Sequence, residues 1–534
     1  MHEAMDKSRV KGFLRAEGTR MVNGDGEEVI LTGVGLGNWL LCEGYMWRSH
    51  FDVFNKPRNI EAGIRELAGS GYAGGFWKKF RENYITREDI RAIAEAGFNS
   101  VRIPINWRGV MENEPGITWK EDGFRLIENC VNWCEEFGIY AFLDLHGAPG
   151  GQTGDNIDDA VDFYPRLFMD ADSRVKALAL WQELARRYKD RWIVGGYDLL
   201  NEPIRTVRPG MPDVDFLLPE LHRFYIDCVA AVREIDGVHM LSIEGHHWAT
   251  DTSVFTHRFD DNMCIHFHRY WCMPGMEAYR EFLELSRRLD CPLWLGETGE
   301  NSSEWYAAMY GLAYSLHIGV NFWPWKKMAC KNSPYSVKMP AGWEKLLGFF
   351  NGGVRPSYEE TWAMLDEYLE NMKLENCDYN PDVIPSILRR PGCRLPGVAF
   401  DMVPGKGVSF SGLRRKAPLF KYQGFSGMGI VPREPLPEKE SPGPRGNGWE
   451  ALTLEMTAGE WADYTFYGLK NTSLVLEVSA VEGAEVTVLQ DGKALASLTL
   501  RNGETAPVAL EDSARALLTL RCGKGSFRLD ALRI

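Results

Sequence analysis

The sequence predicts an α/β protein, a (β/α)8 TIM barrel followed by a smaller all-β sandwich domain. Two observations lead to this prediction. Short, nearly continuous apolar runs alternate with longer helical patterns over about residues 28–375, as expected of parallel strands that helices cover on both faces. Beyond that region the helical patterns give way to short runs of alternating apolar and polar residues, which are typical of a β-sandwich.

Eight apolar runs are expected to form the barrel strands. Each is short, rich in β-branched or aromatic residues, and separated from the next by a helical pattern, so the chain contains eight βα units. The eight runs are residues 29–39, 100–105, 140–146, 197–203, 239–245, 263–270, 293–299 and 319–325.

The segments between these runs carry helix-capping signals. In residues 86–100, Thr86 is a suitable N-cap, Asp89 suits the first turn, and Gly97 marks the end of the helix. The same pattern of buried and exposed positions occurs in residues 173–190 and 358–372.

The chain is expected to divide into two domains. The barrel carries insertions at about residues 45–82 and at 205–217, and a stretch rich in Pro, Gly and charge at 432–448 is predicted to be a linker or long loop. Residues 397–402 and 407–412 resemble early strands of the second domain. The predicted division is residues 1–375 for the barrel, 376–394 for a connecting segment and 395–534 for the β-sandwich.

Composition and charge exclude several classes of partner. The 534 residues carry a formal net charge of -14 without a stripe of Lys or Arg, which argues against nucleic acid. No run of about 18 apolar residues exists, so no membrane partner is expected. The N-terminus lacks a signal-peptide core, and the 11 scattered cysteines then indicate reduced thiols in a cytoplasmic protein. Nothing in the sequence predicts an oligomeric state.

No metal or organic cofactor is expected. Cys130 and Cys134 lie one helical turn apart, but without a second pair nearby a buried helix face is the better interpretation. His246 and His247 are adjacent, yet no third ligand follows at a usual spacing, so a loop at the rim of the barrel is favoured.

Polar side chains gather at the predicted carboxyl ends of the strands, where barrel enzymes build their active sites. Two glutamates stand out, because Glu202 follows the fourth strand and Glu297 the seventh, on opposite sides of an eight-stranded barrel. The residues at these ends are Trp39, Glu43, Arg102, Asn106, Trp107, His146, Asn201, Glu202, Glu244, His246, His247, His268, Tyr270, Glu297, Trp323, Trp325 and Lys326.

Two carboxylates that face each other across a barrel mouth suggest glycoside hydrolysis. One acid protonates the leaving oxygen, and the other attacks the anomeric carbon or activates water. A carboxyl separation of about 5–5.5 Å gives retention of configuration, whereas about 6.5–9.5 Å gives inversion. The alternative for either glutamate is a structural ion pair.

Six motifs in order resemble glycoside hydrolase family 5 over most of residues 15–370. "YDLLNEP" and "LWLGETG" are similar to the acid/base and nucleophile motifs of that family. The other four are "SVRIPINW", similar to its strand-two arginine motif, "LDLHGAPGGQ", similar to its strand-three histidine motif, "NMCIHFHRY", which matches its His-x-Tyr motif, and "NFWPWK", which matches its strand-eight tryptophan.

The resemblance implies roles for individual residues. Glu297 would be the nucleophile, Glu202 the general acid/base, and Asn201 the partner of the sugar 2-hydroxyl. The remaining substrate-binding residues would be Arg102 and Tyr270 beside Glu297, His146 and His268 as positioning groups, and Trp323 as a platform under the sugar.

A narrower resemblance concerns the substrate. "GVGLGNWLLCEGYMW" and "LHGAPGGQTGDN" look like the exo-acting β-1,3-glucanase branch of the family, in which a glutamate at the position of Glu43 binds the terminal glucose. Asn38 and Asn156 depart from that branch, where a glycine and usually an aspartate occur. A loop charge is the alternative for Glu43.

The C-terminal domain is similar to the β-sandwich carbohydrate-binding modules of families 6 and 35, through "AGEWADYTF" and "GSFRLDALRI". Sugar binding, packing on the barrel and dimerisation remain alternatives for it. Its aromatic residues Trp449, Trp461 and Tyr464 suit either a core or a sugar platform.

The predicted function is a retaining β-glycosidase with a carbohydrate substrate, exo-acting on β-linked glucosides or related sugars. An endo-acting β-glucanase of the same family is the first alternative, and a non-catalytic carbohydrate-binding protein is the second.

Overall fold

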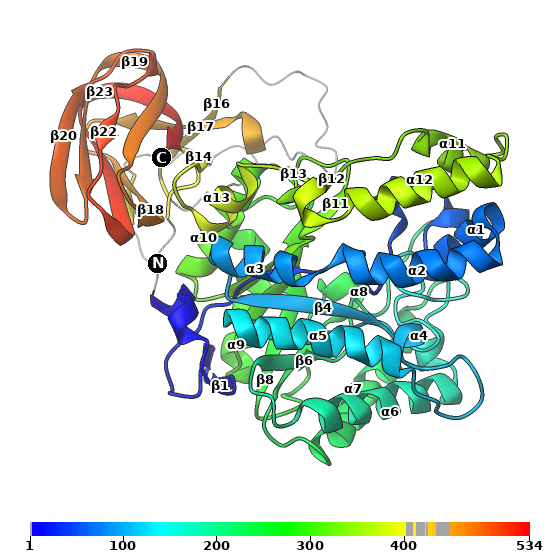
Figure 1. The fold of residues 1–534 in the computed structure, drawn as a ribbon. Helices are drawn as coiled ribbons and strands as arrows, with labels where there is room; N and C mark the ends of the chain where they lie inside the picture. Colours follow the sequence, from blue (N-terminus) through cyan, green and yellow to red (C-terminus); the bar gives the residue numbers. More distant parts are fainter. Residues whose placement is uncertain (1–2, 402–408, 413–421, 423–425, 434–448) are drawn as a thin grey trace.

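The computed structural model describes residues 3–401, 409–412, 422, 426–433 and 449–534. Eight parallel strands close into a barrel in the order β10-β3-β4-β5-β6-β7-β8-β9, and an all-β region follows at the C-terminal end of the chain (Figure 1). The predicted α/β fold class is therefore confirmed. The barrel strands are β3 Thr32–Gly35, β4 Ser100–Asn106, β5 Tyr140–Gly147, β6 Val194–Asp198, β7 Met240–Glu244, β8 Met263–His268, β9 Leu293–Gly299 and β10 Gly319–Trp323.

Two predicted strands have different bounds. The first run, 29–39, contributes only the four residues of β3. The fourth strand begins earlier than predicted and includes Gly195 and Gly196. Glycine is needed at both positions, because a Cβ on either would lie within 3.0 Å of the Phe142 ring in the neighbouring strand. The strand ends at Asp198, so Glu202 lies on the loop beyond it, with a left-handed φ of 43°.

The α-helices surround the barrel and have the capping chemistry that the sequence predicts. Thr86 and Asp89 form a capping box at the start of α3, and Gly97 adopts the left-handed conformation at its end. The helices are α1 Pro57–Ala68, α2 Ser70–Tyr84, α3 Arg87–Ala96, α4 Trp107–Val110, α5 Glu121–Phe137, α6 Ala171–Tyr188, α7 Leu218–Arg233, α8 His246–Ala249, α9 Arg280–Leu289, α10 Ser303–Ser315, α11 Trp343–Phe349, α12 Tyr358–Asn371 and α13 Val383–Leu388.

The first insertion is a helical layer on one side of the barrel. It contains the 3-10 turns η3 Gly44–Trp47 and η4 Asp52–Phe54 and the helices α1 and α2, which lie beside α12 in Figure 1. Trp47 is fully buried there, stacked on Phe80 at 5.4 Å and close to Trp343 of α11. In the second insertion, residues 205–214 form neither helix nor strand, and a 3-10 turn, Asp215–Leu217, follows.

Small strands join the barrel to the connecting segment. Strand β13 (Asp378–Tyr379) pairs with β12 (Tyr335–Val337), which itself pairs with β11 (Lys326–Met328). The predicted connecting segment 376–394 is thus not a free linker at its start, because hydrogen bonds tie it to the barrel. Near the other end of the chain, β1 (Arg15–Glu17) and β2 (Arg20–Val22) form a hairpin.

The described C-terminal strands are connected by hydrogen bonds, and β23 is central to them. It pairs with β17 and β18 on one side and with β19 on the other. Trp449 and Tyr464 are buried core residues, whereas Trp461 is only half-buried. The strands are β14 Arg394–Pro396, β15 Phe410–Ser411, β16 Gly429–Pro432, β17 Leu452–Thr457, β18 Trp461–Leu469, β19 Ser473–Gln490, β20 Lys493–Thr499, β21 Gly503–Glu504, β22 Val508–Ala509 and β23 Ser513–Arg533.

Predictions around the start of this region have mixed outcomes. The strand predicted at 397–402 is wrong over residues 397–401, where the chain turns and Ala399 N–H donates to Pro396 O. The strand predicted at 407–412 is present as β15, although residues 407–408 lie outside the described residues. The predicted linker falls almost wholly on residues 434–448, which are also outside them.

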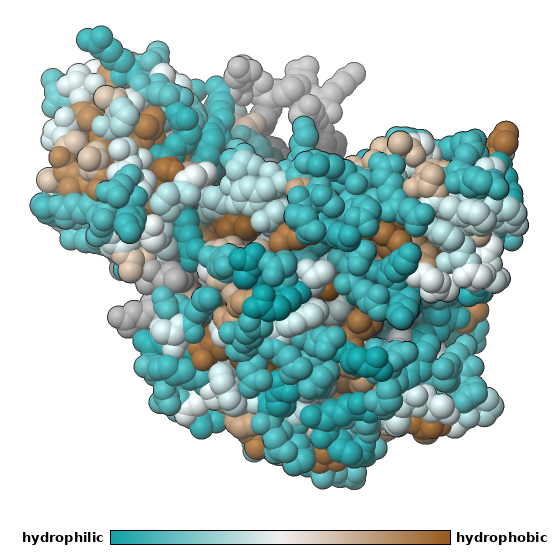
Figure 2. Space-filling model, viewed as in Figure 1, coloured by the Kyte–Doolittle hydropathy of each residue, from teal (hydrophilic) through white to brown (hydrophobic). Residues whose placement is uncertain are grey.

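The large aromatic side chains are used mainly as core. Inside the barrel, Phe142 and Trp294 pack with ring centroids 4.5 Å apart, and His266 lies 4.6 Å from Trp294, so an aromatic layer underlies the polar groups described below. On the face seen in Figure 2, hydrophilic residues dominate and hydrophobic ones are scattered. Within the described chain, no helix combines the length and the apolar character that a membrane crossing requires.

Candidate active site

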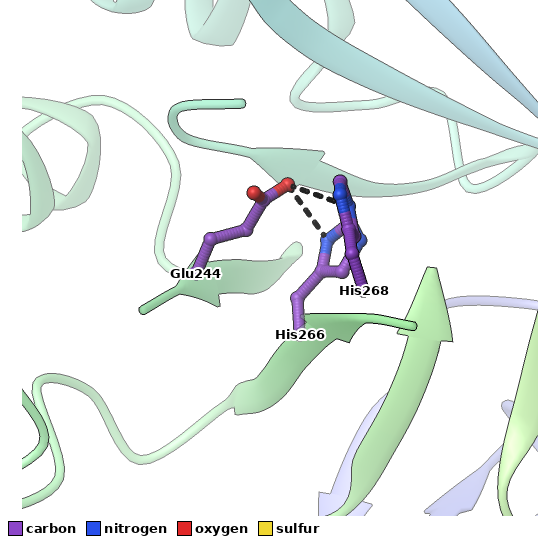
Figure 3. A group of neighbouring side chains, drawn as sticks. All are labelled: Glu244, His266 and His268. Atoms are coloured by element: carbon purple, nitrogen blue, oxygen red, sulfur yellow. Dashed lines mark hydrogen bonds and ion pairs between the residues drawn. The ribbon is translucent and has the colours of Figure 1, made fainter. Parts of the chain in front are cut away.

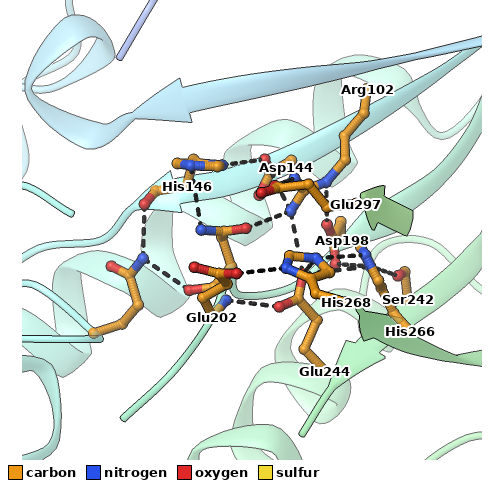
Figure 4. A network of polar contacts seen from close by, with 12 residues as sticks. Arg102, Asp144, His146, Asp198, Glu202, Ser242, Glu244, His266, His268 and Glu297 are labelled. Carbon is orange, nitrogen blue, oxygen red and sulfur yellow. Dashed lines mark hydrogen bonds and ion pairs between the residues drawn. The ribbon is translucent and has the colours of Figure 1, made fainter. Parts of the chain in front are cut away.

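Arg102 lies at the centre of a buried polar network that joins six barrel strands. It projects from β4 and is fully buried. Its Nη1 lies 2.6 Å from Glu297 Oε2 and its Nε 2.8 Å from Asp198 Oδ2, while Nη2 donates to Asn201 Oδ1 at 2.7 Å (Figure 4). One guanidinium thus fixes side chains from β9, β6 and the loop that follows β6.

Two further carboxylates contact the same guanidinium. Glu244 of β7 lies 3.1 Å from Arg102 Nη2, and Asp144 of β5 lies 3.2 Å from it. Isolated buried charges are strongly disfavoured, so each of these acids depends on a cation, a proton or a hydrogen-bond donor. Four buried carboxyl groups contact one arginine and Glu202 contacts His268, so the surplus negative charge must be met by protons on the acids or the histidines.

Glu297 has the environment of an ionised carboxylate. The Tyr270 hydroxyl donates to its Oε1 at 2.8 Å, and Arg102 holds its other oxygen. Burial opposes ionisation, but His268 and Arg102 together lower the pKa of Glu297 below its usual range. The nucleophile position that the family resemblance implies is therefore occupied by a group that is negatively charged at neutral pH.

The pKa of Glu202 shifts in the opposite direction. Burial raises its pKa, partly offset by His268, whose Nδ1 lies 2.7 Å from Glu202 Oε1. Its backbone is fixed on both sides, since Glu202 N–H donates to Glu244 Oε2 at 2.6 Å and the Thr153 hydroxyl donates to Glu202 O at 2.7 Å. These bonds hold the residue in its left-handed conformation.

The two glutamates are close enough for a double-displacement reaction. A carboxylate oxygen of Glu202 and one of Glu297 lie within 4.8 Å of each other. A separation this short leaves less room between the groups than an inverting glycosidase needs for its water molecule. The opposite pKa directions of the two groups match an acid and a nucleophile.

His146 links the loop after β6 to strand β10. Its Nδ1 lies 2.8 Å from Asp144 Oδ2, so Nδ1 carries the proton and Nε2 accepts from Asn201 Nδ2 at 3.2 Å. Burial, aided by Arg102, lowers the pKa of His146 to about 4, so the ring is neutral at neutral pH. It stacks on Trp323 with centroids 5.1 Å apart and planes 6° apart, and Trp323 Nε1 donates to Tyr45 OH at 3.0 Å.

Glu43 is a buried carboxylate with an unused acceptor. The residue is 3% exposed and its Oε1 makes no hydrogen bond within the described chain. Burial, reinforced by the charges of Glu297 and Glu202, raises its pKa well above the usual range. An oxygen in this state is suited to accept a hydrogen bond from a ligand hydroxyl.

The structure brings all nine predicted site residues into this region, but the sequence analysis missed part of the network. Asp144 and His266 lie two residues before His146 and His268, and a spacing of two places side chains on the same face of a strand. That spacing was the available signal. Gln152, also missed, donates to the backbone oxygens of His146 and Asn201 at 2.7 and 2.9 Å.

Other strand-end residues point elsewhere. Trp325 Nε1 and Lys326 Nζ both contact Asp89 Oδ1 of α3, outside the barrel. His247 Nε2 lies 2.8 Å from Asp215 at the rim. His246 and His247 do have a third possible metal ligand beside them, Asp251, which the sequence spacing did not reveal. One nitrogen or carboxylate oxygen of each of the three residues lies within 4.8 Å of the others.

Two other groups of acidic and histidine side chains share His268. They combine it with Glu244 and His266, or with Glu202 and Glu297. The histidine nitrogens already have partners within the network, and the Arg102 guanidinium lies against Glu244 and Glu297. A metal ion would be repelled by that guanidinium, so protons are the better counter-charges.

Residues 61–329, half of the chain, match the family model described as Cellulase (glycosyl hydrolase family 5). The chain belongs to glycosyl hydrolase family 5. This result agrees with the order of its motifs along the sequence and with the two glutamates at the mouth of the barrel.

Relatives of several kinds match part of this family 5 chain. A "Beta-xylosidase" of Phanerodontia chrysosporium is 32% identical over 46% of this chain and 48% of that protein. A "Glucan 1,3-beta-glucosidase" of Lachancea kluyveri is 27% identical over 52% and 65%. An "Endoglucanase C" of Acetivibrio thermocellus is 30% identical over 36% and 53%. The chain thus spans about half the length of the first of these relatives.

One solved structure aligns with nearly the whole length of this family 5 chain. The "Crystal structure of endogalactoceramidase" matches 97% of this chain and 99% of its own, at 14% identity and a TM-score of 0.46.

Proposed function

We propose that this family 5 protein is a retaining β-glycosidase that acts on β-linked glucosides or related sugars, with Glu297 as nucleophile and Glu202 as general acid/base. The observation that carries the proposal is the pair of buried carboxylates with oxygens within 4.8 Å of each other and with opposite pKa directions. That separation and that difference are what double displacement requires.

The reaction has two steps. Glu297 attacks the anomeric carbon while Glu202 gives its proton to the glycosidic oxygen, so the bond to the aglycone breaks and a glycosyl ester forms on Glu297. In the second step Glu202 takes a proton from a water molecule, which attacks the same carbon and releases Glu297. Both substitutions invert the anomeric centre, and the net result is retention.

The surrounding residues support these steps. Arg102 and Tyr270 stabilise the negative charge of Glu297 before attack, at 2.6 and 2.8 Å. Asn201 is held by Arg102 and His146, and we assign it the hydrogen bond to the sugar 2-hydroxyl, which strengthens in the transition state. Trp323 would offer its ring to the sugar face.

Exo action is supported by Glu43. An unpaired buried carboxylate near both catalytic groups is suited to bind hydroxyls of a terminal sugar. The exo-acting branch that the sequence resembles has a glutamate at the matching place. The match to a protein named glucan 1,3-beta-glucosidase adds support.

The test compares wild type with Glu297→Gln on a panel of p-nitrophenyl β-glycosides that spans glucose, galactose, mannose, xylose and fucose. We expect release from at least one sugar and its loss in the variant, because an amide cannot attack the anomeric carbon. Proton NMR of fresh product from the best substrate is expected to detect the β-anomer first. Full activity in Glu297→Gln, or inversion, would contradict the assignment.

Endo action on a β-glucan is the second candidate, because "Endoglucanase C" matches as well. An endo-enzyme would be inactive on the aryl monosaccharides and would cut a cello- or laminari-oligosaccharide internally. The product sizes from a reducing-end-labelled oligosaccharide separate the two candidates.

A further inference from the structure

His266 and His268 form a close pair beneath the proposed acid/base. They are two residues apart on β8, so both side chains point to the same face, into the barrel, and both are fully buried. Their Nε2 atoms lie 3.0 Å apart. Figure 3 shows the pair with Glu244, whose carboxylate contacts both rings. His268 belongs to the His-x-Tyr motif of the family, but His266 has no role in the mechanism described so far.

The hydrogen-bond partners of the pair suit three protons on its four ring nitrogens. His268 Nδ1 faces Glu202 Oε1 at 2.7 Å, and His266 Nδ1 faces Asp198 Oδ1 at 3.1 Å, so an N–H on each can bond an acidic oxygen. Two nitrogens 3.0 Å apart are joined by one proton. Three protons on four ring nitrogens make one imidazole and one imidazolium, and the pair carries a single positive charge.

We propose that this charge moves between the two rings, and that His266 is a positioning residue for the proton cycle of Glu202. The inference rests on the proposed function and extends it. The charge lies on His266 while Glu202 holds its catalytic proton, and on His268 while Glu202 is ionised.

Protons balance at each step of this relay. When Glu202 gives its proton to the glycosidic oxygen, the shared proton passes from His266 Nε2 to His268 Nε2, and the positive charge comes next to the new carboxylate. When Glu202 takes a proton from water in the second step, the shared proton returns to His266 Nε2. No bond other than N–H breaks in the relay, and the total charge of the network changes only by the proton that Glu202 gives or takes.

The acidic groups around the pair act at both of its ends. Glu244 Oε1 lies 3.4 Å from His266 Nδ1 and 3.4 Å from His268 Nε2, and thus favours neither ring by distance. Asp198 attracts the charge at one end of the pair and ionised Glu202 attracts it at the other. The protonation state of Glu202 therefore decides between the two positions.

The remaining charged groups do not favour the two positions equally, because Glu297 draws the charge toward His268. They are Arg102, Asp144, His146 and Glu297, which face the same network from β4, β5 and β9. Burial opposes the charge on His268, yet Glu244 and Glu297 raise its pKa well above the usual range. His266 and Arg102 keep the pKa of Asp198 well below the usual range despite its burial.

The fold makes specific room for His266. A Cβ on Gly296, the residue before Glu297, would lie 2.0 Å from His266 Nε2, so only glycine leaves space for the ring. Ser242 Oγ, 2.8 Å from His266 Nδ1, provides a second partner on the Asp198 side.

The experiment measures kcat/KM against pH for wild type and His266→Gln, with the sugar that the wild type releases fastest. Glutamine can still accept from His268 Nε2 but cannot carry the charge, which then stays beside Glu202 and favours its ionised form. We expect the basic limb, where Glu202 loses its proton, to move to lower pH by about one unit. On that limb, kcat/KM for a phenyl glycoside should fall about tenfold.

The leaving group separates a proton effect from general damage. A 2,4-dinitrophenyl leaving group needs no protonation, so its kcat/KM should change less than about twofold in His266→Gln. A distorted site would instead reduce both substrates equally at every pH. That second result, or an unmoved basic limb in the folded variant, would overturn the relay.

Two further variants keep the test decisive. Asp198→Asn removes the anion that holds the charge on His266, and it should move the basic limb in the same direction even if His266→Gln does not fold. Ser242→Ala should leave the limb in place, since Asp198 still accepts the Nδ1 proton. If wild type cleaves no β-glycoside, the proposed function fails; if wild type is active but the limb stays fixed in both His266→Gln and Asp198→Asn, only the relay fails.

Discussion

Glu43 combines a proposed role in binding with a cost in stability. A buried carboxylate with an unbonded oxygen, close to Glu202 and Glu297, is unfavourable in the free protein. Glu43→Gln should therefore raise the stability by about 1 kcal/mol while it lowers kcat/KM at least about tenfold. Thermal unfolding checks the gain in stability, and aryl glycoside kinetics check the fall in kcat/KM.

A neighbouring glutamate provides the control for that prediction. Glu300 pairs with Lys327, so Glu300→Gln breaks a partly buried ion pair and should lower the melting temperature. A rise in stability for both variants would indicate a general charge effect instead of the specific strain at Glu43.

The pH dependence of catalysis follows from two residues. The proposed mechanism needs Glu297 ionised and Glu202 protonated, and the environment moves their pKa values in opposite directions, Glu297 downward and Glu202 upward. We expect a bell-shaped kcat/KM profile with an acid limb below the usual glutamate range and a basic limb above it. Glu202→Gln should still cleave substrates whose leaving group needs no acid, and its profile with them should show no basic limb. A profile without a basic limb in wild type would contradict this assignment.

At the scale of elements, the spacing of the barrel strands depends on glycines. Gly296→Ala would force the new Cβ against the His266 ring, only 2.0 Å away in the present packing. Both elements are buried and cannot shift freely, so we expect a loss of about 2 kcal/mol or more in stability and a strong fall in kcat/KM. Denaturant unfolding measures the loss of stability, and aryl glycoside kinetics measure the fall in kcat/KM.

Helix α2 supplies the matched control. A Cβ on Gly74 meets nothing within 4 Å, and alanine has the higher helix propensity. Gly74→Ala is therefore expected to leave activity unchanged and to stabilise the protein by about 0.5–1 kcal/mol. Similar losses in both variants would mean that the clash with His266 is not the cause.

At the scale of the whole molecule, Arg389 connects the barrel to the C-terminal region. It is 2% exposed, donates to Ala307 O of α10 at 2.7 Å, and lies 2.9 Å from Asp401 Oδ1. Arg389→Met would leave Asp401 buried without its cation, so we expect a loss of about 3–5 kcal/mol. Limited proteolysis should then cleave near the junction.

Arg394 is the control, because its ion pair with Glu477 is one-third exposed. Arg394→Met should cost no more than about 1 kcal/mol. Equal losses at the two positions would argue that the junction is held by its apolar contacts and not by the buried arginine.

The sequence was sufficient for most of the architecture because βα units repeat a strong pattern. The capping box of α3 and six of the eight strands, which lie within two residues of their predicted bounds, follow from local chemistry and periodicity. Strand β3 is shorter than predicted. The end of β6 was missed, because the apolar residues Leu199 and Leu200 continue the strand pattern while the backbone has already turned toward Glu202. The resemblance of the C-terminal region to carbohydrate-binding modules stays a prediction.

The sequence by itself determined the barrel, the family and the two glutamates, since each is encoded in a short stretch of neighbouring residues. Only the tertiary structure decided which groups share protons. Asp144, Asp198, Glu244 and His266 come from four segments, and each alone looks like an ordinary strand residue. Closing the barrel places them around Arg102 and His268 in a site without bulk water, where distances of about 3 Å determine the charge of every group.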